Sequence, residues 1–418
     1  MGIKKGNTFI NKYGNEISLE QLRDNTVIVD LFYILHKFTR INISNPLHYI
    51  LELINFIVKF KSYGITPIFV IDGRPLLEKT KKLQKSREKA TMKLHKILES
   101  DTNTHSDINI KKSMAINKEH VNACKDLFNR LDCLYLHITN CEGDTVIAEL
   151  VSLLEKNVNE EDNYGNSRRV FVYSNDFDMF LYDINYILKD LDFDKDTFKL
   201  YIKEDILNDL NITQDELILS SFITGTDYNC GIYKATMESS IELNKNYGPF
   251  KTLDDFISTL PRINNDREDN HKILIPSYNF IDKYELVTNI FTLNNTKTFT
   301  RTSIINFINE KVKYMEIETK KNTLSNLFNI RYVLEYIETI TQDSYLIQKY
   351  RAKIIKYSKI HFGFTIRFDS NIDIDSNINS DSNISTGSDN DNDSNNIYGY
   401  KYDYYDNKFY DNHYNNYV

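Results

Sequence analysis

Short runs of apolar residues alternate with longer stretches of helical periodicity, mostly within the first half of the chain. The short runs are rich in β-branched and aromatic residues, which favour buried strands. They occupy residues 26–29, 67–71, 133–138, 169–174 and 198–202. Helical spacing from Pro46 to Lys61 separates the first two runs. This alternation predicts an α/β fold with a mainly parallel central sheet and helices on both faces.

Acidic side chains stand at the ends of the predicted strands. Asp30 and Asp72 follow the first two runs, and a Glu-Gly-Asp sequence opens the helix after the third. An Asn-Asp-Phe-Asp sequence follows the fourth run, and another aspartate follows an apolar helix predicted over residues 217–223. The carboxyl ends of parallel strands meet at one edge of a sheet, where α/β proteins bind ligands. The carboxylates that we expect to converge there are Asp30, Asp72, Glu142, Asp144, Asp176, Asp178 and Asp227.

Seven carboxylates at one edge need cations, because like charges raise one another's pKa. Ligands that are all oxygen, with no Cys or His cluster beside them, select Mg²⁺ or Mn²⁺ over zinc. Two such ions about 3.5–4 Å apart are a common apparatus for phosphodiester hydrolysis. A single aspartate after a strand is more often a helix N-cap or a turn residue. We therefore predict a two-metal site in which one or two of these carboxylates are dispensable.

The net charge of −8 lies in the last fifty residues of the 418-residue chain. From Asp369 to Val418 there are ten Asp, two Lys and no Glu, so residues 1–368 carry equal numbers of basic and acidic side chains. This low-complexity segment predicts a disordered acidic tail rich in Asn, Asp and Tyr. Residues 74–125 hold 13 basic and six acidic side chains. Such an excess suits a polyanionic substrate, although a solvated helix face has the same pattern.

Composition argues against several other classes of protein. No apolar run reaches the ~18–20 residues of a membrane-spanning helix, and residues 1–10 lack the apolar stretch of a signal peptide. The four cysteines form no C-x-x-C pair, which argues against a disulfide framework or a zinc ribbon. Since 41% of the residues are hydrophobic, the chain can form a substantial core. We expect a soluble intracellular protein with no membrane partner.

Linked motifs in this chain resemble the flap endonuclease/XPG family of structure-specific 5′ nucleases. The stretch VIVDLFYILHKF is similar to the first catalytic-aspartate motif, and GITPIFVIDGRP closely matches the family's G-I-x-P-x-[FY]-V-F-D-G-x-P segment. The resemblance continues through NCEGD and VYSNDFDMFLY and ends with SSFITGTDYNCGI, so it covers most of residues 1–260. It implies a PIN-like 5′ nuclease fold with a helical arch and a helix-two-turn-helix-like element. The sequence pattern beyond the resemblance predicts a helical C-terminal region.

The resemblance implies two Mg²⁺ ions in the active site, with Mn²⁺ as a substitute. One ion is implied at Asp30, Asp72, Glu142 and Asp144, and the other at Asp176, Asp178 and Asp227. Catalytic roles are implied for Lys79, which would clamp the phosphate, and for Gly2, whose amine is freed when the initiator methionine is lost. A further catalytic role is implied for Arg87, one residue after the position of the family's arginine. DNA contacts are implied for His36, Lys85, Lys111, Lys112, Gly231 and Lys234.

The sequence departs from the family's motifs at three places. E-G-D replaces the usual E-A-E, and His36 replaces a tyrosine that stacks on DNA. His36 has an alternative role as an ordinary residue on a helix face. The segment Gly231–Ala235 lacks one glycine of the element that holds a potassium ion in the family. No Q-x-x-Ψ-x-x-aromatic sequence, which would bind a sliding clamp, appears at the C-terminus.

We expect five regions, the first three implied by the resemblance and the last two predicted from the sequence pattern and composition. They are an XPG N-terminal-type region at 1–105, an internal-type region at 106–227, a degenerate helix-two-turn-helix-like element at 228–265, a helical region at 266–368 and the tail at 369–418. The first two form one catalytic domain. The predicted function is metal-dependent hydrolysis of flap or branched DNA in replication, repair or recombination, by a monomer in a nucleus or at a viral replication site. A 5′-3′ exonuclease, a junction-resolving enzyme and a catalytically reduced DNA-binding scaffold are the alternatives.

Overall fold

The computed structural model describes the chain in ranges that are separated by gaps. The described residues are 3, 6–39, 48–77, 79–80, 88, 92, 116–161, 169–268, 271–275, 279–294, 296–312, 330–341 and 344–362. They belong to one compact unit, Met1–Ile366. The predicted helical arch, apart from isolated positions, and the predicted acidic tail lie outside these ranges. None of the helices in these ranges is long and apolar enough to cross a membrane.

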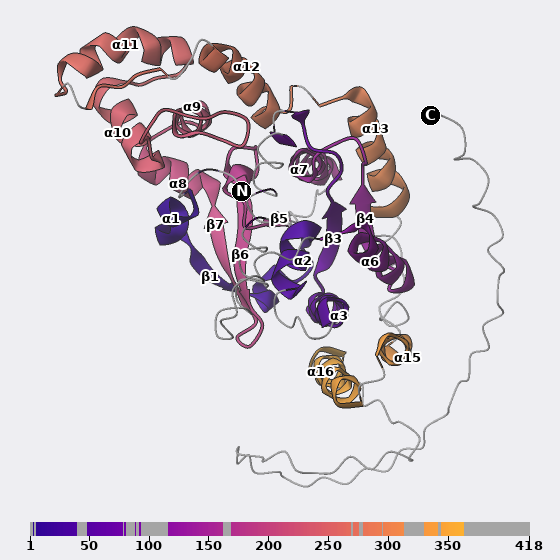
Figure 1. Cartoon of the computed structure of the whole chain (residues 1–418). Helices are drawn as coiled ribbons and strands as arrows, with labels where there is room; N and C mark the ends of the chain where they lie inside the picture. The colour runs from indigo at the N-terminus through magenta and orange to yellow at the C-terminus, as the bar shows by residue number, and fades with distance from the viewer. Residues whose placement is uncertain are drawn as a thin grey trace, which may run out of the picture. The chain divides into compact units, whose positions relative to one another are not determined.

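A seven-stranded sheet forms the centre of this unit, in the order β1-β7-β6-β5-β2-β3-β4 (Figure 1). The strands are β1 (Asn15–Ser18), β2 (Thr26–Asp30), β3 (Thr66–Ile71), β4 (Leu134–His137), β5 (Val170–Tyr173), β6 (Tyr186–Asp192) and β7 (Thr197–Ile202). β2 pairs in parallel with β3 and β5, β3 with β4, and β5 with β6. β7 is antiparallel to both β6 and β1. The sheet is therefore mainly parallel, which confirms the predicted fold class.

Helices cover both faces of the sheet (Figure 1). Those before β5 are α1 (Gly6–Ile10), η1 (Asn11–Tyr13), η2 (Leu19–Leu22), α2 (Leu31–Thr39), α3 (His48–Ser62), α6 (Lys118–Arg130) and α7 (Gly143–Glu161). Those after β5 are η3 (Phe177–Phe180), α8 (Lys203–Leu210), α9 (Gln214–Thr224), α10 (Met237–Tyr247), α11 (Leu253–Asn265), α12 (Asn279–Phe291), α13 (Thr298–Phe307), η5 (Ile308–Val312), α15 (Ile330–Ile340) and α16 (Ser344–Phe362). Among the described residues, the region predicted to be helical after residue 266 thus contains α12, α13, η5, α15 and α16.

Neighbouring residues of the central strands face opposite layers of the core. Ile28 of β2 packs in one layer with residues of α7 and α9, whereas Val27 and Val29 pack in the other with residues of α2, α3 and α6. Because side chains alternate along a strand, a strand covered on both faces needs a continuous apolar run. This requirement explains why continuous apolar runs of the sequence coincide with β2, β3 and β5, whereas β4 and β7 are only partly buried.

The structure adds two strands that the sequence pattern did not predict. β6 is interrupted by charged residues, yet Lys189 within it is buried. β1 has four residues, of which Asn15 and Glu16 are exposed, and among the described strands it pairs with β7 at the edge of the sheet. Its exposed residues leave no continuous apolar run in the sequence.

Candidate active site

Three of the predicted carboxylates lie along one edge of the sheet, where the parallel strands end. Asp30 is the last residue of β2, Asp72 follows β3 directly, and Asp176 follows β5 after two residues. β3, β2 and β5 are neighbours and run in the same direction. Their carboxyl ends therefore bring these side chains together, as the sequence predicted.

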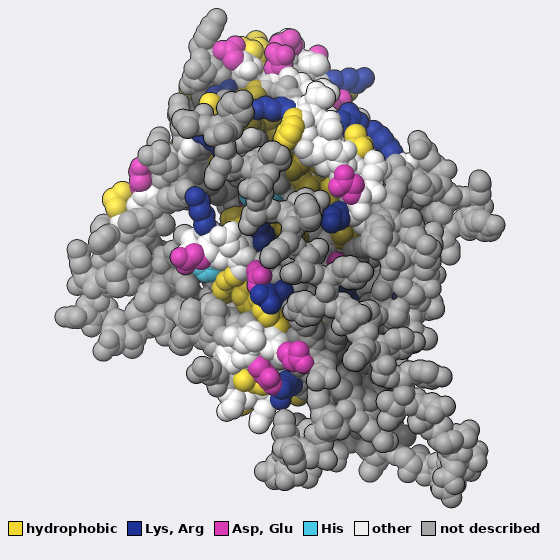
Figure 2. Space-filling view, turned by 90° about the vertical axis from the view of Figure 1, so that its right-hand side faces the viewer, with side chains coloured by type: hydrophobic (Ala, Val, Ile, Leu, Met, Phe, Trp, Pro, Cys, Tyr) yellow, Lys and Arg dark blue, Asp and Glu magenta, His cyan; other side chains and the backbone are white. Residues whose placement is uncertain are grey.

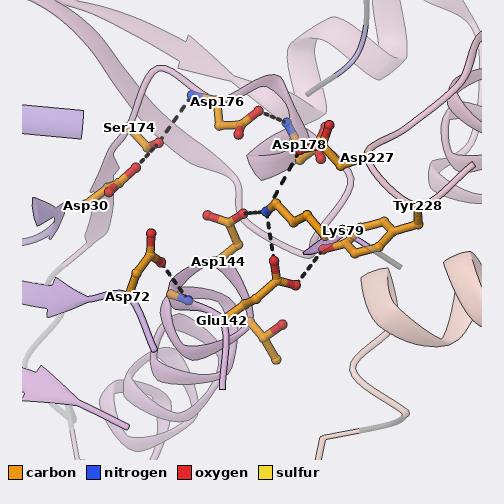
Figure 3. Close-up of polar contacts among 12 residues, drawn as sticks. Asp30, Asp72, Lys79, Glu142, Asp144, Ser174, Asp176, Asp178, Asp227 and Tyr228 are labelled. Atoms are coloured by element: carbon orange, nitrogen blue, oxygen red, sulfur yellow. Dashed lines mark hydrogen bonds and ion pairs between the residues drawn. The ribbon is translucent and has the colours of Figure 1, made fainter. Parts of the chain in front are cut away.

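The other four predicted carboxylates come from helix starts and one loop beside this edge. Glu142 and Asp144 flank the first residue of α7, Asp178 lies in η3, and Asp227 lies in the loop after α9. Figure 3 shows the seven side chains around one region of the molecule. We call these seven residues the carboxylate cluster.

A glycine allows two segments of the cluster to approach each other closely. The backbone N–H of Gly143 donates to Oδ1 of Asp72 at 2.9 Å. A Cβ atom at position 143 would lie 2.0 Å from that same oxygen. An alanine here would thus displace the Asp72 carboxylate or the start of α7. The contact gives a physical reason for the E-G-D sequence that departs from the family's E-A-E.

Asp30 is held by two hydrogen bonds. The hydroxyl of Ser174 donates to Oδ2 at 2.8 Å, and the backbone N–H of Tyr33 donates to Oδ1 at 3.1 Å. Burial and the neighbouring Asp144 raise the pKa of Asp30 to about 7, although both hydrogen bonds favour the charged form. Without a bound cation, Asp30 is therefore partly protonated at neutral pH.

Asp178 has the surroundings expected of a cation ligand. The residue is 1% exposed, and neither carboxylate oxygen has a hydrogen-bond partner among the described residues. Burial, together with Asp176 and Asp227, raises its pKa well above the usual value. A buried carboxylate without donors is costly unless it is protonated or bound to a cation. Its oxygens, and the all-oxygen donor set around them, therefore fit Mg²⁺ or Mn²⁺.

Lys79 places an ammonium group inside the carboxylate cluster (Figure 3). Its Nζ lies 2.9 Å from Oε1 of Glu142, 3.3 Å from Oδ2 of Asp144 and 3.9 Å from Oδ2 of Asp227. Burial opposes the charge, but Asp144 and Glu142 outweigh it and raise the pKa of Lys79. In this arrangement the described residues contain no group of three or more His, Cys, Asp or Glu placed to hold a metal ion. The ammonium takes over part of the charge compensation that a cation would supply.

Two residues that the sequence did not single out support the cluster. The Tyr228 hydroxyl donates to Oε2 of Glu142 at 2.9 Å, and Tyr228 is buried. Ser174, also buried, bridges two strand ends, since its Oγ donates to Asp30 and accepts the backbone N–H of Asp176 at 3.2 Å. Each stands within two residues of a predicted carboxylate in the sequence. That adjacency was the only available signal.

The predicted DNA-contacting residues are placed in part. His36 lies half-buried on α2, and Gly231 and Lys234 lie in the loop between α9 and α10. Gly231 has a φ of 64°, and a Cβ atom there would lie 2.4 Å from the carbonyl oxygen of Thr224, so this turn requires glycine. Lys234 is exposed, and its Nζ lies 5.3 Å from the centre of the Tyr233 ring.

The remaining predicted site residues lie outside the described ranges. They are Gly2 and Arg87, predicted to be catalytic, and Lys85, Lys111 and Lys112, predicted to contact DNA. On the face shown in Figure 2, Lys and Arg side chains of the described residues are interspersed with Asp and Glu side chains. The described part of this face therefore shows charges of both signs and does not by itself mark a binding surface for DNA.

Comparison with known proteins gives matches in sequence. The XPG N-terminal domain matches residues 1–93. Flap endonuclease 1 of Methanocaldococcus jannaschii is 29% identical over 245 residues, which span 55% of this chain and 70% of that protein. Flap endonuclease 1 of Methanocella arvoryzae is 22% identical over 261 residues, with coverages of 56% and 72%.

Solved structures match in fold. The catalytic core of Rad2 in complex with a DNA substrate has a TM-score of 0.58 at 16% identity, covering 85% of this chain and 100% of that one. The Holliday junction-resolving enzyme GEN1, in complex with product DNA and Mg²⁺, has a TM-score of 0.53 at 15% identity, covering 83% and 77%. At these identities the likeness establishes the fold.

The sheet order, the helices on both faces and these structural matches define a PIN-like nuclease fold of the XPG type. The motifs of the sequence and the matched relatives narrow this class further. These matches, over residues 1–93 and over about half of the chain, support a member of the flap endonuclease/XPG family. A member of this family is a nuclease, that is, a hydrolase that acts on DNA.

Proposed function

We propose that this chain is a divalent-metal-dependent, structure-specific 5′ nuclease that hydrolyses phosphodiester bonds in flap or branched DNA. The observation that carries the proposal is Asp178, whose two buried oxygens have no hydrogen-bond partner among the described residues, within a cluster of carboxylates at one sheet edge. The DNA and Mg²⁺ bound to Rad2 and GEN1 support the substrate class and the cofactor.

The residues that would hold the ions form two groups. The first group is Asp30, Asp72, Glu142 and Asp144, and the second is Asp176, Asp178 and Asp227. When bound, two divalent ions activate a water as nucleophile and stabilise the leaving oxygen of the phosphodiester. The hydrogen bonds from Ser174, Gly143 and Tyr228 orient the carboxylates of the first group.

Lys79 has two roles in this proposal. Before metal binds, its ammonium compensates the charge of Glu142 and Asp144. Because the ammonium lies between oxygens of the first group, it must move away from them for a cation to be held there. The freed ammonium can then meet the scissile phosphate and stabilise the negative charge that develops on it. Lys79 thus compensates charge in the resting protein and acts on the substrate in the loaded one.

The division of the chain follows from the same proposal. Residues 1–105 and 106–227 supply the carboxylate cluster and form the catalytic domain, and residues 228–265 grip duplex DNA through the turn that contains Gly231 and Lys234. Residues 266–368 add helices, of which α13 packs on α7 and α16 packs on α3. Residues 369–418 form an acidic tail. We propose that the protein acts as a monomer.

A cleavage panel tests the proposed function. Flap, nicked, four-way junction and blunt duplex DNAs of matched sequence, labelled at the 5′ end, are incubated with the protein in Mg²⁺ or in EDTA. We expect cleavage near the branch of the flap or junction in Mg²⁺ and none in EDTA. The matched control is the Asp178→Asn variant, which keeps the size of the side chain and removes its charge.

Each pattern of products decides between the functions that the sequence left open. Release of the labelled 5′-terminal nucleotide from blunt ends indicates a 5′-3′ exonuclease, and symmetric cuts in the junction alone indicate a resolving enzyme. Binding of branched DNA without cutting indicates a scaffold. Equal cleavage in Mg²⁺ and EDTA, or by the wild type and Asp178→Asn alike, would contradict the metal-dependent mechanism.

A further inference from the structure

A buried lysine lies behind the carboxylate cluster without an acidic partner. Lys189 of β6 is 2% exposed, and no carboxylate of the described residues lies within ion-pair distance of its Nζ. The ammonium lies 5.0 Å from the centre of the Phe180 ring and 5.7 Å from that of Tyr201. A buried ammonium that is not paired with a carboxylate costs stability, so its hydrogen bonds should reveal what it does.

Those hydrogen bonds join three segments that are distant in the sequence. Nζ of Lys189 donates to Oδ1 of Asn7 at 2.7 Å and to the carbonyl oxygen of Asn175 at 3.4 Å. Nδ2 of Asn7 donates to the same carbonyl oxygen at 2.9 Å. Lys189, Asn7 and Asn175 therefore form a closed triangle of hydrogen bonds between β6, α1 and the segment that follows β5.

Close packing brings α1 against the same segment. A Cβ atom at Gly6 would lie 2.6 Å from the ring of Phe177, which means that the helix backbone rests directly on this ring. Gly6 and Asn7 are neighbours, as are Asn175, Asp176 and Phe177. The hydrogen-bonded triangle and this contact thus hold α1 to the residues on both sides of Asp176.

Hydrogen bonds hold both ends of the peptide group between Asn175 and Asp176. The carbonyl of Asn175 and the N–H of Asp176 belong to a single planar peptide unit. Asn7 and Lys189 bond the carbonyl end, while the N–H end donates to Oγ of Ser174 at 3.2 Å. A plane that is bonded at both ends cannot rotate freely, so it sets the direction in which the Asp176 side chain leaves the backbone.

The orientation of this peptide group also affects the position of Asp178. Oδ1 of Asp176 accepts the backbone N–H of Asp178 at 3.2 Å, which begins η3. A rotation of the peptide before Asp176 would therefore move the carboxylate of Asp176 and the start of η3 together. These are the two residues that the proposed function assigns to one cation.

We propose that Lys189 is a positioning residue that, with Asn7, holds the Asn175–Asp176 peptide so that Asp176 and Asp178 are aligned to bind one divalent cation. The inference rests on the proposed function, since it concerns the cation of that site. Groups that orient metal ligands through hydrogen bonds typically change metal affinity by about 10–100-fold when they are removed.

Removal of the Lys189 ammonium should not lower the stability of the fold, but it should weaken the binding of the cation. Burial lowers the pKa of Lys189 to about 8, although Asp176 acts to raise it. Below that pH the folded protein bears the cost of a buried charge that the unfolded chain does not bear. Replacement by methionine relieves this cost and loses the hydrogen bonds to Asn7 and Asn175. At pH 7 the melting temperature of Lys189→Met should therefore stay equal to that of the wild type or rise, while cation binding weakens.

The test is a titration of the full chain with Mn²⁺, in which electron paramagnetic resonance measures the free ion and no DNA is present. The variants are Lys189→Met, Lys189→Arg, Asn7→Ala and the double variant Lys189→Met/Asn7→Ala. The matched control is Lys199→Met, because Lys199 pairs with Lys189 across the β6/β7 ladder and its side chain is 49% exposed. Melting temperatures of all variants are measured at pH 7 in EDTA.

We expect Lys189→Met to weaken binding of Mn²⁺ by about 10-fold or more, without a lower melting temperature. Lys189→Arg, which keeps a donor and the charge, should recover part of the affinity, and Lys199→Met should bind as the wild type does. The double variant should lose no more affinity than Lys189→Met alone, because both residues act through one peptide group.

Two results would overturn the inference and leave the proposed function intact. One is a Lys189→Met affinity within about threefold of the wild type, well below the effect of a positioning group. The other is a weaker affinity that is accompanied by an equal loss in Lys199→Met or by a lower melting temperature. A wild-type protein that binds no Mn²⁺ would overturn the proposed metal site and this inference together.

Discussion

The metal-free protein should lose stability as the pH rises from 5 to 8, and Mg²⁺ should restore it. Burial and Asp144 raise the pKa of Asp30 to about 7 and that of Asp176 to about 6. A carboxyl group with a higher pKa in the folded than in the unfolded protein stabilises the fold while it is protonated. This contribution is complete below pH ~4, and it disappears as the pH passes through the folded-state pKa values.

The size of the effect follows from one residue. A rise in pKa from 3.8 to about 7 for Asp30 corresponds to about 4 kcal/mol between the fully protonated and the fully ionised limit. The carboxylates interact, so their contributions do not add, and the change over a limited pH range is smaller. At about 2 °C per kcal/mol, expected for a larger domain, the melting temperature should fall by about 5 °C between pH 5 and pH 8.

Thermal unfolding followed by circular dichroism, in EDTA and in saturating Mg²⁺, measures this effect. Metal ligands must be deprotonated to bind, so the stabilisation by Mg²⁺ should grow as the pH rises. Burial lowers the pKa of His48 and of His137, which adds an opposite trend in this pH range. Because both histidines lie outside the proposed ligand set, comparing the two conditions at each pH removes most of their contribution.

The control is the double variant Asp176→Asn/Asp178→Asn. It lacks two of the groups with raised pKa values but keeps Asp30, so its melting temperature should fall less with pH, and Mg²⁺ should stabilise it less, than is the case for the wild type. Stabilisation by Mg²⁺ that is equal at pH 5 and pH 8 would refute the reasoning. The same pH-dependent stabilisation in wild type and control would refute it as well.

Three further predictions concern the ion pairs of Lys79, the acidic segment 369–418 and the predicted phosphate contacts. Lys79→Met should lower the melting temperature in EDTA, since removal of one partner from a buried ion pair such as that with Glu142 typically costs about 3–5 kcal/mol. Mg²⁺ should remove most of the difference in melting temperature between this variant and the wild type. Equal losses of stability with and without Mg²⁺ would contradict the charge-compensating role. Deletion of residues 369–418 should leave the cleavage rate at moderate salt nearly unchanged, because salt screens the effect of the segment's net charge of −8 beyond about a Debye length. A truncated chain that does not cut DNA would show that these residues are part of the fold. If Lys79, Lys85 and Arg87 each contact a phosphate, the triple alanine variant should reduce the slope of log K against log salt for DNA binding by about 2–3. An unchanged slope would mean that these side chains do not contact phosphates.

The sequence predicted the central sheet because its inner strands are covered on both faces and therefore read as continuous apolar runs. It did not predict β6, where Lys189 interrupts the apolar run. The sequence does not show that this lysine is buried, because its hydrogen bond to Asn7 is visible only in the structure. It did not predict β1 either, since a short strand at the sheet edge with exposed residues has no distinctive pattern. These two omissions explain why five strands were predicted in a sheet of seven.

The seven carboxylates of the candidate site could be predicted because each stands at a strand end or a helix start, and topology alone brings such positions together. Their supporting contacts could not be predicted. Tyr228 reaches Glu142 across 86 residues of sequence, and Ser174 reaches Asp30 across 144. The role of Gly143 likewise needed the distance to Asp72, because the sequence alone showed only a departure from a motif.

The most direct test of the central claim, that the carboxylate cluster is the metal centre of a nuclease, is single-turnover cleavage of a 5′-flap DNA in Mg²⁺ by the wild type and by Asp176→Asn/Asp178→Asn. Both proteins must first show the same circular dichroism spectrum and bind the DNA with the same affinity. The account predicts cleavage by the wild type and its removal in the variant, because the loss of two carboxylates lowers the occupancy of the metal site. A variant that cleaves the flap within about tenfold of the wild-type rate would contradict the assignment, since the loss of two ligands of a catalytic metal costs far more than about 1.4 kcal/mol in the barrier.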